Sequence, residues 1–109
     1  MNNQRTAINN KVDNVLKMAE QYAHAVYGIA HKLPKHELYG LTSQLRRAAL
    51  PVPLNVVEGY ARQSKKSEAQ FLTIAYGSLK EAQFILNFAA IQGYIAICLF
   101  TFRRFREFF

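Results

Sequence analysis

Apolar residues recur at steps of three and four along most of the chain. Over residues 7–32 they keep this period without a break, which is typical of an amphipathic helix. Pro34 ends the pattern, because a proline has no N–H and its ring clashes with the preceding turn. The same period predicts three more helices, over Lys35–Arg62, over Ser67–Ile91 and from about Tyr94 to the end. The predicted fold class is therefore all-α, an antiparallel up-down four-helix bundle.

Two prolines interrupt the second predicted helix. Pro51 and Pro53 each remove a backbone donor, so we expect this helix to be kinked at Pro51/Pro53. The polar run that follows, up to Ser67, is typical of a turn between helices. We expect Ser67 to cap the third helix, with Gln70 three residues later completing a capping box.

The length of 109 residues predicts one domain over residues 1–109, since single domains usually have about 100–150 residues. A domain this small buries a limited share of its surface, which favours self-association. The formal net charge of +7 favours anionic partners such as nucleic acid, although it also serves solubility. Cys98 is the one cysteine, which rules out an internal disulfide and agrees with a cytoplasmic location.

The segment from Phe84 to Phe102 carries no charged residue. Its length is close to the roughly 20 apolar residues that span a bilayer. Asn87 and the pair Gln92-Gly93 argue against a span, because Gln92-Gly93 is typical of a helix end. We therefore interpret this segment as parts of two bundle helices joined by a short turn. A small membrane protein is the less favoured alternative.

A polar set recurs at helical spacing in the middle of the chain. Asn55, Glu58 and Arg62 share one helix face, and Ser78 and Glu81 repeat the same step of three on the next helix. One interpretation is a structural hydrogen-bonded network between the second and third helices, which contains a Glu58–Arg62 pair. The other is that the set faces a subunit interface or a ligand. Small residues among these positions would let the two helices approach closely: Gly59, Ala61, Ala75 and Gly77.

Basic residues form the candidate nucleic-acid contacts: Arg46, Arg47, Arg62, Lys65 and Lys66. Such side chains can neutralise phosphates without reading base sequence. A further basic cluster closes the chain, at Arg103, Arg104 and Arg106. The alternative is a solvated surface that keeps the protein soluble. Tyr39, Tyr60 and Tyr76 are either stacking platforms for bases or, as their helical spacing favours, core or interface aromatics.

The sequence contains no recognisable catalytic or cofactor-binding motif. The glycines form no phosphate-binding loop, and Glu58 and Glu81 are not followed by the histidine that a di-iron bundle requires. His24 and His31 share a helix face without an evident carboxylate partner, so we expect no metal site. Ser78 has no identifiable base beside it. We therefore expect a non-enzymatic protein with no cofactor and no small-molecule substrate.

The central part of the chain resembles a known family. Asn55-x-x-Glu58-Gly59, followed by Gly77-Ser78-x-x-Glu81, is the specific part of a resemblance that runs from about Tyr22 to Tyr94. The family is that of the four-helix-bundle proteins encoded within intervening sequences of bacterial 23S rRNA genes. The resemblance implies an antiparallel four-helix bundle and a homo-oligomer, with a ring-like pentamer as the expected state. The apolar stretch Ile95–Phe102 departs from the family, whose last helix is amphipathic.

Two functional hypotheses follow. The first is an oligomeric helical-bundle protein that binds RNA or a ribonucleoprotein through its basic surface. The second is an accessory adaptor that holds a retroelement reverse transcriptase together with its RNA, because the accessory proteins of diversity-generating retroelements are similar to this fold. RNA, a reverse transcriptase and further copies of the chain itself are thus the expected partners.

Overall fold

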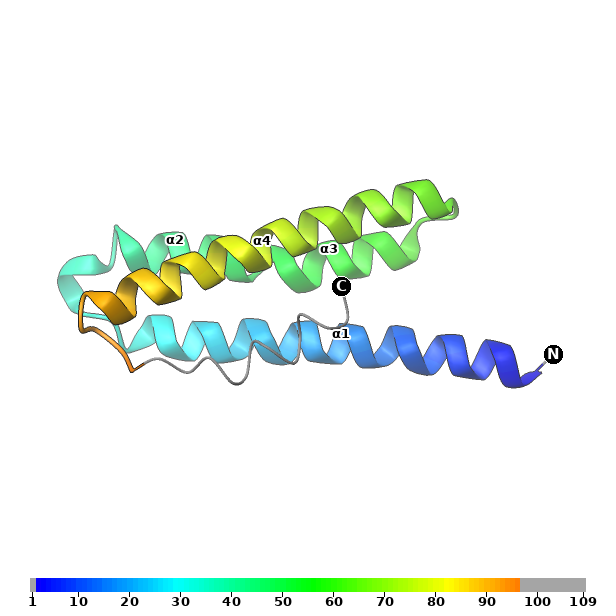
Figure 1. The fold of residues 1–109 in the computed structure, drawn as a ribbon, viewed down its shortest axis with the longest axis horizontal. Helices are drawn as coiled ribbons and strands as arrows, with labels where there is room; N and C mark the ends of the chain where they lie inside the picture. Colours follow the sequence, from blue (N-terminus) through cyan, green and yellow to red (C-terminus); the bar gives the residue numbers. More distant parts are fainter. Residues whose placement is uncertain (1, 97–109) are drawn as a thin grey trace.

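The computed structural model describes residues 2–96, and every regular element among them is helical. Figure 1 shows α1 (Asn2–His31), the consecutive helices α2 (Leu41–Ala49) and α3 (Pro51–Ala61), and α4 (Lys65–Ile91) running side by side in alternating directions. The predicted all-α class is confirmed. The described residues form three antiparallel helical segments: α1, the bent pair α2 and α3, and α4. The bent pair α2–α3 is called the middle column. The predicted fourth helix falls almost entirely on residues 97–109, outside the described range. A short 3-10 helix, η1 (Lys35–Glu37), lies between α1 and α2.

The bend in the middle column lies at the two prolines, as predicted. Leu50 joins α2 to α3 with helical dihedral angles (φ −63°, ψ −38°), so the chain continues in the same direction. Pro51 and Pro53 have no N–H, which leaves the carbonyls of Arg47 and Ala49 without an i+4 amide donor. The loss of these two bonds on one stretch accounts for the bend.

Both ends of the middle column differ from the prediction. The column was expected to start at Lys35, but residues 35–37 form a 3-10 turn and α2 starts at Leu41. The Glu37 carboxylate accepts the Leu41 N–H at 3.1 Å and so satisfies a free donor of the first helical turn. At the other end α3 stops at Ala61, and Arg62 is extended.

The cap of α4 is also three residues earlier than predicted. The Ser64 hydroxyl accepts the Ser67 N–H at 3.1 Å, so Ser64 is the N-cap and the helix starts at Lys65. Ser67 was expected to cap the helix, and that prediction was wrong, because its own amide is the group being capped. At the far end, α4 stops at Ile91 and Gly93 takes the positive φ of +80° that terminates many helices. The predicted break at Gln92-Gly93 is confirmed.

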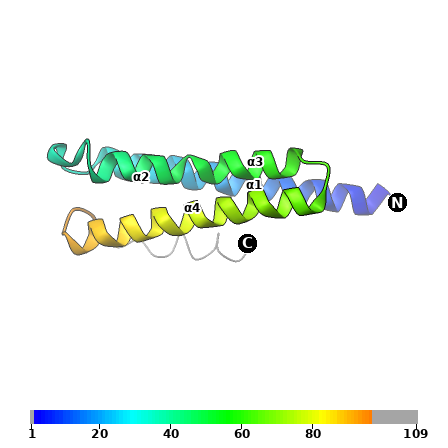
Figure 2. The same ribbon diagram turned by 90° about the horizontal axis from the view of Figure 1, so that it is seen from above.

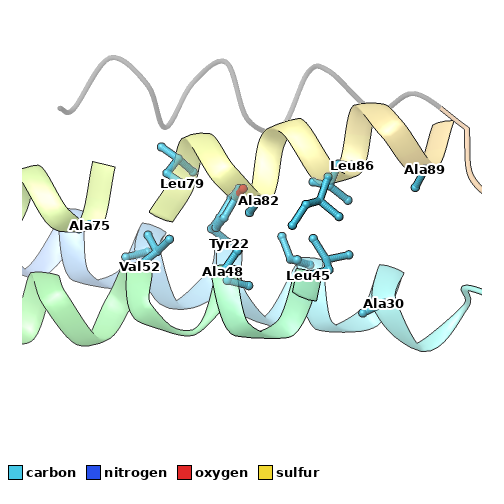
Figure 3. Close-up of a cluster of buried hydrophobic side chains, with 14 of the residues drawn as sticks. Tyr22, Ala30, Leu45, Ala48, Val52, Ala75, Leu79, Ala82, Leu86 and Ala89 are labelled. Carbon is cyan, nitrogen blue, oxygen red and sulfur yellow. The ribbon is translucent and has the colours of Figure 1, made fainter. Parts of the chain in front are cut away.

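The core lies between the three columns (Figure 3). Leu45 from the middle column, Leu79 from α4 and Val26 from α1 are its largest fully buried side chains. Several alanines complete it, and their small side chains allow the helices to lie close together. Ile8 is 61% exposed, since α1 extends past the other helices at its start (Figure 1). The core alanines are Ala19, Ala30, Ala48, Ala49, Ala75, Ala82 and Ala89.

Close approach of α3 and α4 depends on two of the four small residues singled out in the sequence. A Cβ on Gly59 would lie 3.2 Å from the Glu68 carbonyl oxygen and 3.3 Å from the Phe71 Cβ. Ala75 is fully buried. Ala61 and Gly77 are exposed, and a Cβ on Gly77 would meet nothing within 4 Å, so these two do not serve the contact. Within the described part of the chain, no helix is both long enough and apolar enough to cross a membrane.

Candidate nucleic-acid interface

The five candidate basic residues occupy two separate places. Arg46 and Arg47 lie in the last turn of α2, whereas Arg62, Lys65 and Lys66 flank the turn from α3 to α4. At 1.5 Å per helical residue, the two groups lie roughly 22 Å apart along the bundle. The structure therefore presents two basic regions rather than one cluster.

The region on α2 contains one restrained and one free arginine. Arg46 is half-buried, and its guanidinium carbon lies 5.9 Å from the centroid of the Tyr27 ring on α1. This cation–π contact ties the side chain to the neighbouring helix. Arg47 is exposed and has no such restraint among the described residues. Of the two, Arg47 is the better placed to meet a phosphate.

Arg62 is held by two partners at the α3–α4 turn. Its Nη2 donates to Glu58 Oε2 at 3.1 Å, and its guanidinium carbon lies 4.3 Å from the centroid of the Phe71 ring. The Arg62 and Glu58 side chains are 45% and 55% exposed. The Glu58–Arg62 pair is therefore a surface pair, with much of its attraction screened by water.

Lys65 and Lys66 are exposed in the first turn of α4. Between residues 2 and 96, neither lysine takes part in an ion pair. Positive charge at a helix N-terminus is opposed by the helix dipole, so these lysines do not favour the helix itself. Their charges remain available to an anionic partner.

The rest of the polar set does not form a shared network among the described side chains. Asn55 Nδ2 donates to the Pro51 carbonyl oxygen at 2.8 Å, within its own helix. Ser78 is half-buried and Glu81 is exposed on α4. No hydrogen bond between described side chains joins Asn55, Ser78 or Glu81 to another member of the set. The structure brings together only Glu58 and Arg62.

The three candidate stacking tyrosines lie in different surroundings. Tyr39 is 93% exposed beside the start of α2. Tyr60 packs against the core at the end of α3, and its pKa is raised by burial and further by the nearby Glu68 carboxylate. Tyr76 lies under Lys80, whose ammonium nitrogen is 5.5 Å from the ring centroid. Only Tyr39 offers an open ring to a base.

Two apolar grooves were not predicted. The first, of about 370 Å³, lies between α1 and α3. The second, of similar volume, lies between α2 and α4 and includes Phe84 and Phe88. The signal in the sequence was a second apolar row on the middle column, Leu50, Leu54 and Val57 at i, i+4 and i+7, outside the row that fills the core. The first groove is lined by Leu16, Glu20, Ala23, His24, Tyr27, Leu50, Pro53, Leu54 and Val57.

The described residues hold no group of three or more histidine, cysteine, aspartate or glutamate side chains that could bind a metal ion. His24 lines the first groove beside Glu20, and His31 is exposed at the end of α1. The two histidines thus face an apolar groove and solvent.

Comparison with known proteins agrees with the resemblance seen in the sequence. No curated protein matches the chain. A family model described as 23S rRNA-intervening sequence protein matches residues 11–101, which extends the resemblance toward both ends. That range contains α2, α3 and α4 together with most of α1. The chain therefore belongs to the family of 23S rRNA-intervening sequence proteins.

Proposed function

We propose that this protein is a non-enzymatic helical scaffold that binds RNA through phosphate contacts at the α3–α4 turn. The family's description links these proteins to intervening sequences of 23S rRNA, which brings RNA into the proposal. Lys65 and Lys66 are the preferred contacts, and Arg62 is a weaker one because Glu58 already offsets its charge.

The observation that carries the proposal is the unpaired state of Lys65 and Lys66. Both are exposed, and no ion pair within residues 2–96 offsets them. Both also lie where the helix dipole opposes positive charge, so helix stability does not explain them. The chain as a whole carries a formal charge of +7, which adds long-range attraction for a polyanion.

Arg47, with Arg46 beside it, supplies the second contact region. An RNA backbone that follows the bundle from Arg47 to Lys65 would meet positive charge at two points, which are separated by the length of α3. Contacts of this kind neutralise phosphates and do not read bases, so binding is expected to tolerate sequence and to weaken steeply with salt.

We further propose that the protein acts as a homo-oligomer, with the pentamer implied by the family resemblance as the expected state. Exposed apolar side chains on α3 and α4 support self-association, since a small monomer rarely exposes rows of them. Several copies would repeat each weak phosphate contact and raise the total affinity. A fourth helix, from about Tyr94, is part of the same proposal and completes the four-helix bundle.

The experiment compares two charge reversals of equal size. In the first variant Lys65 and Lys66 are changed to glutamate, and in the control Lys11 and Lys17, exposed on α1, are changed in the same way. Binding to a fluorescent RNA is measured by anisotropy over a range of salt concentrations. We expect the first variant to bind several-fold more weakly and to lose about 0.7–0.9 in the log–log salt slope for each phosphate contact removed.

The control variant loses the same amount of formal charge, so it should bind only slightly more weakly than the parent, by the share that long-range attraction contributes. An equal loss in both variants would mean that overall charge, rather than this turn, attracts RNA. A parent protein without salt-dependent binding would contradict the proposal. In that case the apolar grooves would favour the second candidate, an adaptor whose main partner is a protein such as a reverse transcriptase.

A further inference from the structure

We propose that copies of this chain associate head to tail, with an apolar ridge on α4 of one copy seated in the α1–α3 groove of the next. The ridge consists of Phe84, Phe88 and Ile91, and the groove is the one lined by Leu50, Leu54 and Val57 from the middle column together with α1. The inference rests on the self-association in the proposed function and adds which two surfaces meet.

The ridge is a row of large apolar side chains without cover among residues 2–96. Phe84, Phe88 and Ile91 follow each other at i, i+4 and i+7, so they stand on one face of α4. They are 71%, 45% and 80% exposed. Apolar side chains this large and this close together are typical of an interface.

The groove has the shape that receives such a row. Its floor is formed by Ala23 and Pro53, which are small and buried, and its walls by half-exposed side chains such as Leu54 and Tyr27. Leu50, Leu54 and Val57 have the same i, i+4, i+7 spacing as the ridge, so both rows are about 10 Å long. A helix face with this spacing fits a groove between two helices in the common helix-in-groove mode.

One pair of opposite charges, Glu20 beside the groove and Lys80 beside the ridge, supports a second copy over an unrelated partner, although Glu81 also lies beside Phe84. Glu20 lies in the wall of the groove, and between residues 2 and 96 it makes no ion pair. Lys80 stands one turn before Phe84, at the end of the ridge. Docking the ridge in the groove would bring an acidic and a basic side chain to the same interface, which favours correct pairing.

One copy cannot place its own ridge in its own groove. Figure 2 shows α1 and α3 overlapping, with α4 to one side of them. The ridge and the groove belong to different parts of the surface, so each contact leaves one free ridge and one free groove. Such an interface is heterologous, and it can add further copies in the same direction.

The test uses two variants that each destroy one surface. Leu54→Asp places a charge in the groove, and Phe84→Asp places one on the ridge; both side chains are exposed enough for the fold to tolerate the change. Native masses are measured by sedimentation velocity. We expect the parent to form oligomers, each variant alone to be monomeric, and an equimolar mixture to form a heterodimer and nothing larger.

The heterodimer is the decisive result, because the groove variant keeps its ridge and the ridge variant keeps its groove. Ile8→Asp serves as the matched control, since Ile8 is 61% exposed and lies outside both surfaces, and it should keep the parent mass. Val57→Asp and Ile91→Asp repeat the pair if either first variant loses its helical circular dichroism. A monomeric parent, a mixture that stays monomeric, or loss of association in only one of the two variants would overturn the inference.

The outcome is separable from that of the proposed RNA binding. Monomeric variants that still bind RNA with salt dependence would leave the Lys65–Lys66 site in place. A parent that assembles as described but binds no RNA would support the interface and contradict the proposed function.

Discussion

The two sides of the middle column both carry apolar residues, but only the inner side is buried. On the inner side Leu45, Val52 and Val56 are fully buried against α1 and α4. On the outer side Leu54 and Val57 are 53% and 48% exposed, although their spacing along the helix is equally regular. The difference lies in the neighbours, because the described part of this chain has no helix left to cover the outer side.

This comparison teaches that an apolar period defines a helix face but not what covers it. A row that is apolar and still half exposed carries a free-energy cost, since each buried CH₂ group contributes about 0.8 kcal/mol and each exposed one forgoes it. On the outer side that contribution becomes available through association. The inner row stabilises the fold, and the outer row is free to stabilise an assembly.

The largest expected effect is the difference in stability between a substitution in the inner row and one in the outer row. We expect Leu45→Ala to lower the free energy of unfolding by about 2–5 kcal/mol, because it opens a cavity in the core. Leu54→Ala should change it by about 0.5 kcal/mol or less, as surface substitutions usually do. Both are measured by urea unfolding in the Phe84→Asp background, which the proposed interface predicts to be monomeric, so that association does not add to stability. Similar losses in the two variants would mean that the outer row is already covered within one chain.

The next effect concerns the two glycines of α3 and α4. Gly59→Ala would push a Cβ against the Glu68 carbonyl and the Phe71 Cβ, and we expect a loss of about 1 kcal/mol or more. Gly77→Ala meets nothing within 4 Å and should raise stability by up to about 1 kcal/mol through its higher helix propensity. Thermal unfolding of the two variants gives the comparison. A gain in both would show that α3 and α4 can separate without cost.

A smaller effect comes from the cap of α4. Ser64→Ala removes the acceptor of the Ser67 N–H and should lower the free energy of unfolding by about 1 kcal/mol. Ser67→Ala leaves that bond intact and should have almost no effect. Urea unfolding of the two variants separates the capping residue seen in the structure from the one that the sequence indicated; a larger loss for Ser67→Ala would favour the latter.

The sequence predicts those features that depend on local rules. The helices, the bend at Pro51 and the break at Gly93 follow from apolar period, a missing donor and a glycine at a helix end. The position of the α4 cap was missed because Ser64 and Ser67 both precede a helical pattern, and only the hydrogen bond distinguishes them. Spacing alone therefore located the element to within one turn.

Features that depend on the neighbouring helix were harder to predict. Asn55 was assigned to an interhelical network because it shares a face with Glu58 and Arg62, but its amide donates to the Pro51 carbonyl four residues back. Short polar side chains can hydrogen-bond to backbone carbonyls of their own helix, and helical spacing does not show whether they do so. The α1–α3 groove was missed for a related reason, since an apolar period does not show which residues the neighbouring helix leaves uncovered.

The smallest expected effect is that of the Glu58–Arg62 pair. Because both side chains are about half exposed, Glu58→Ala should lower the free energy of unfolding by less than about 1 kcal/mol. Arg62→Ala should cost more, since it also removes the guanidinium from the Phe71 ring, a contact that contributes about 0.5–1 kcal/mol at exposed sites. In 1 M salt the Debye length is about 3 Å, similar to the length of the pair, so the cost of Glu58→Ala should fall to a fraction of its low-salt value. The part of the Arg62→Ala cost that comes from packing on the ring should remain. Urea unfolding of both variants at low and high salt measures this difference, again in the Phe84→Asp background, which the proposed interface predicts to be monomeric. A loss of about 3 kcal/mol for Glu58→Ala would instead be the cost of leaving a buried arginine without its partner, and would place the pair inside the fold rather than on its surface.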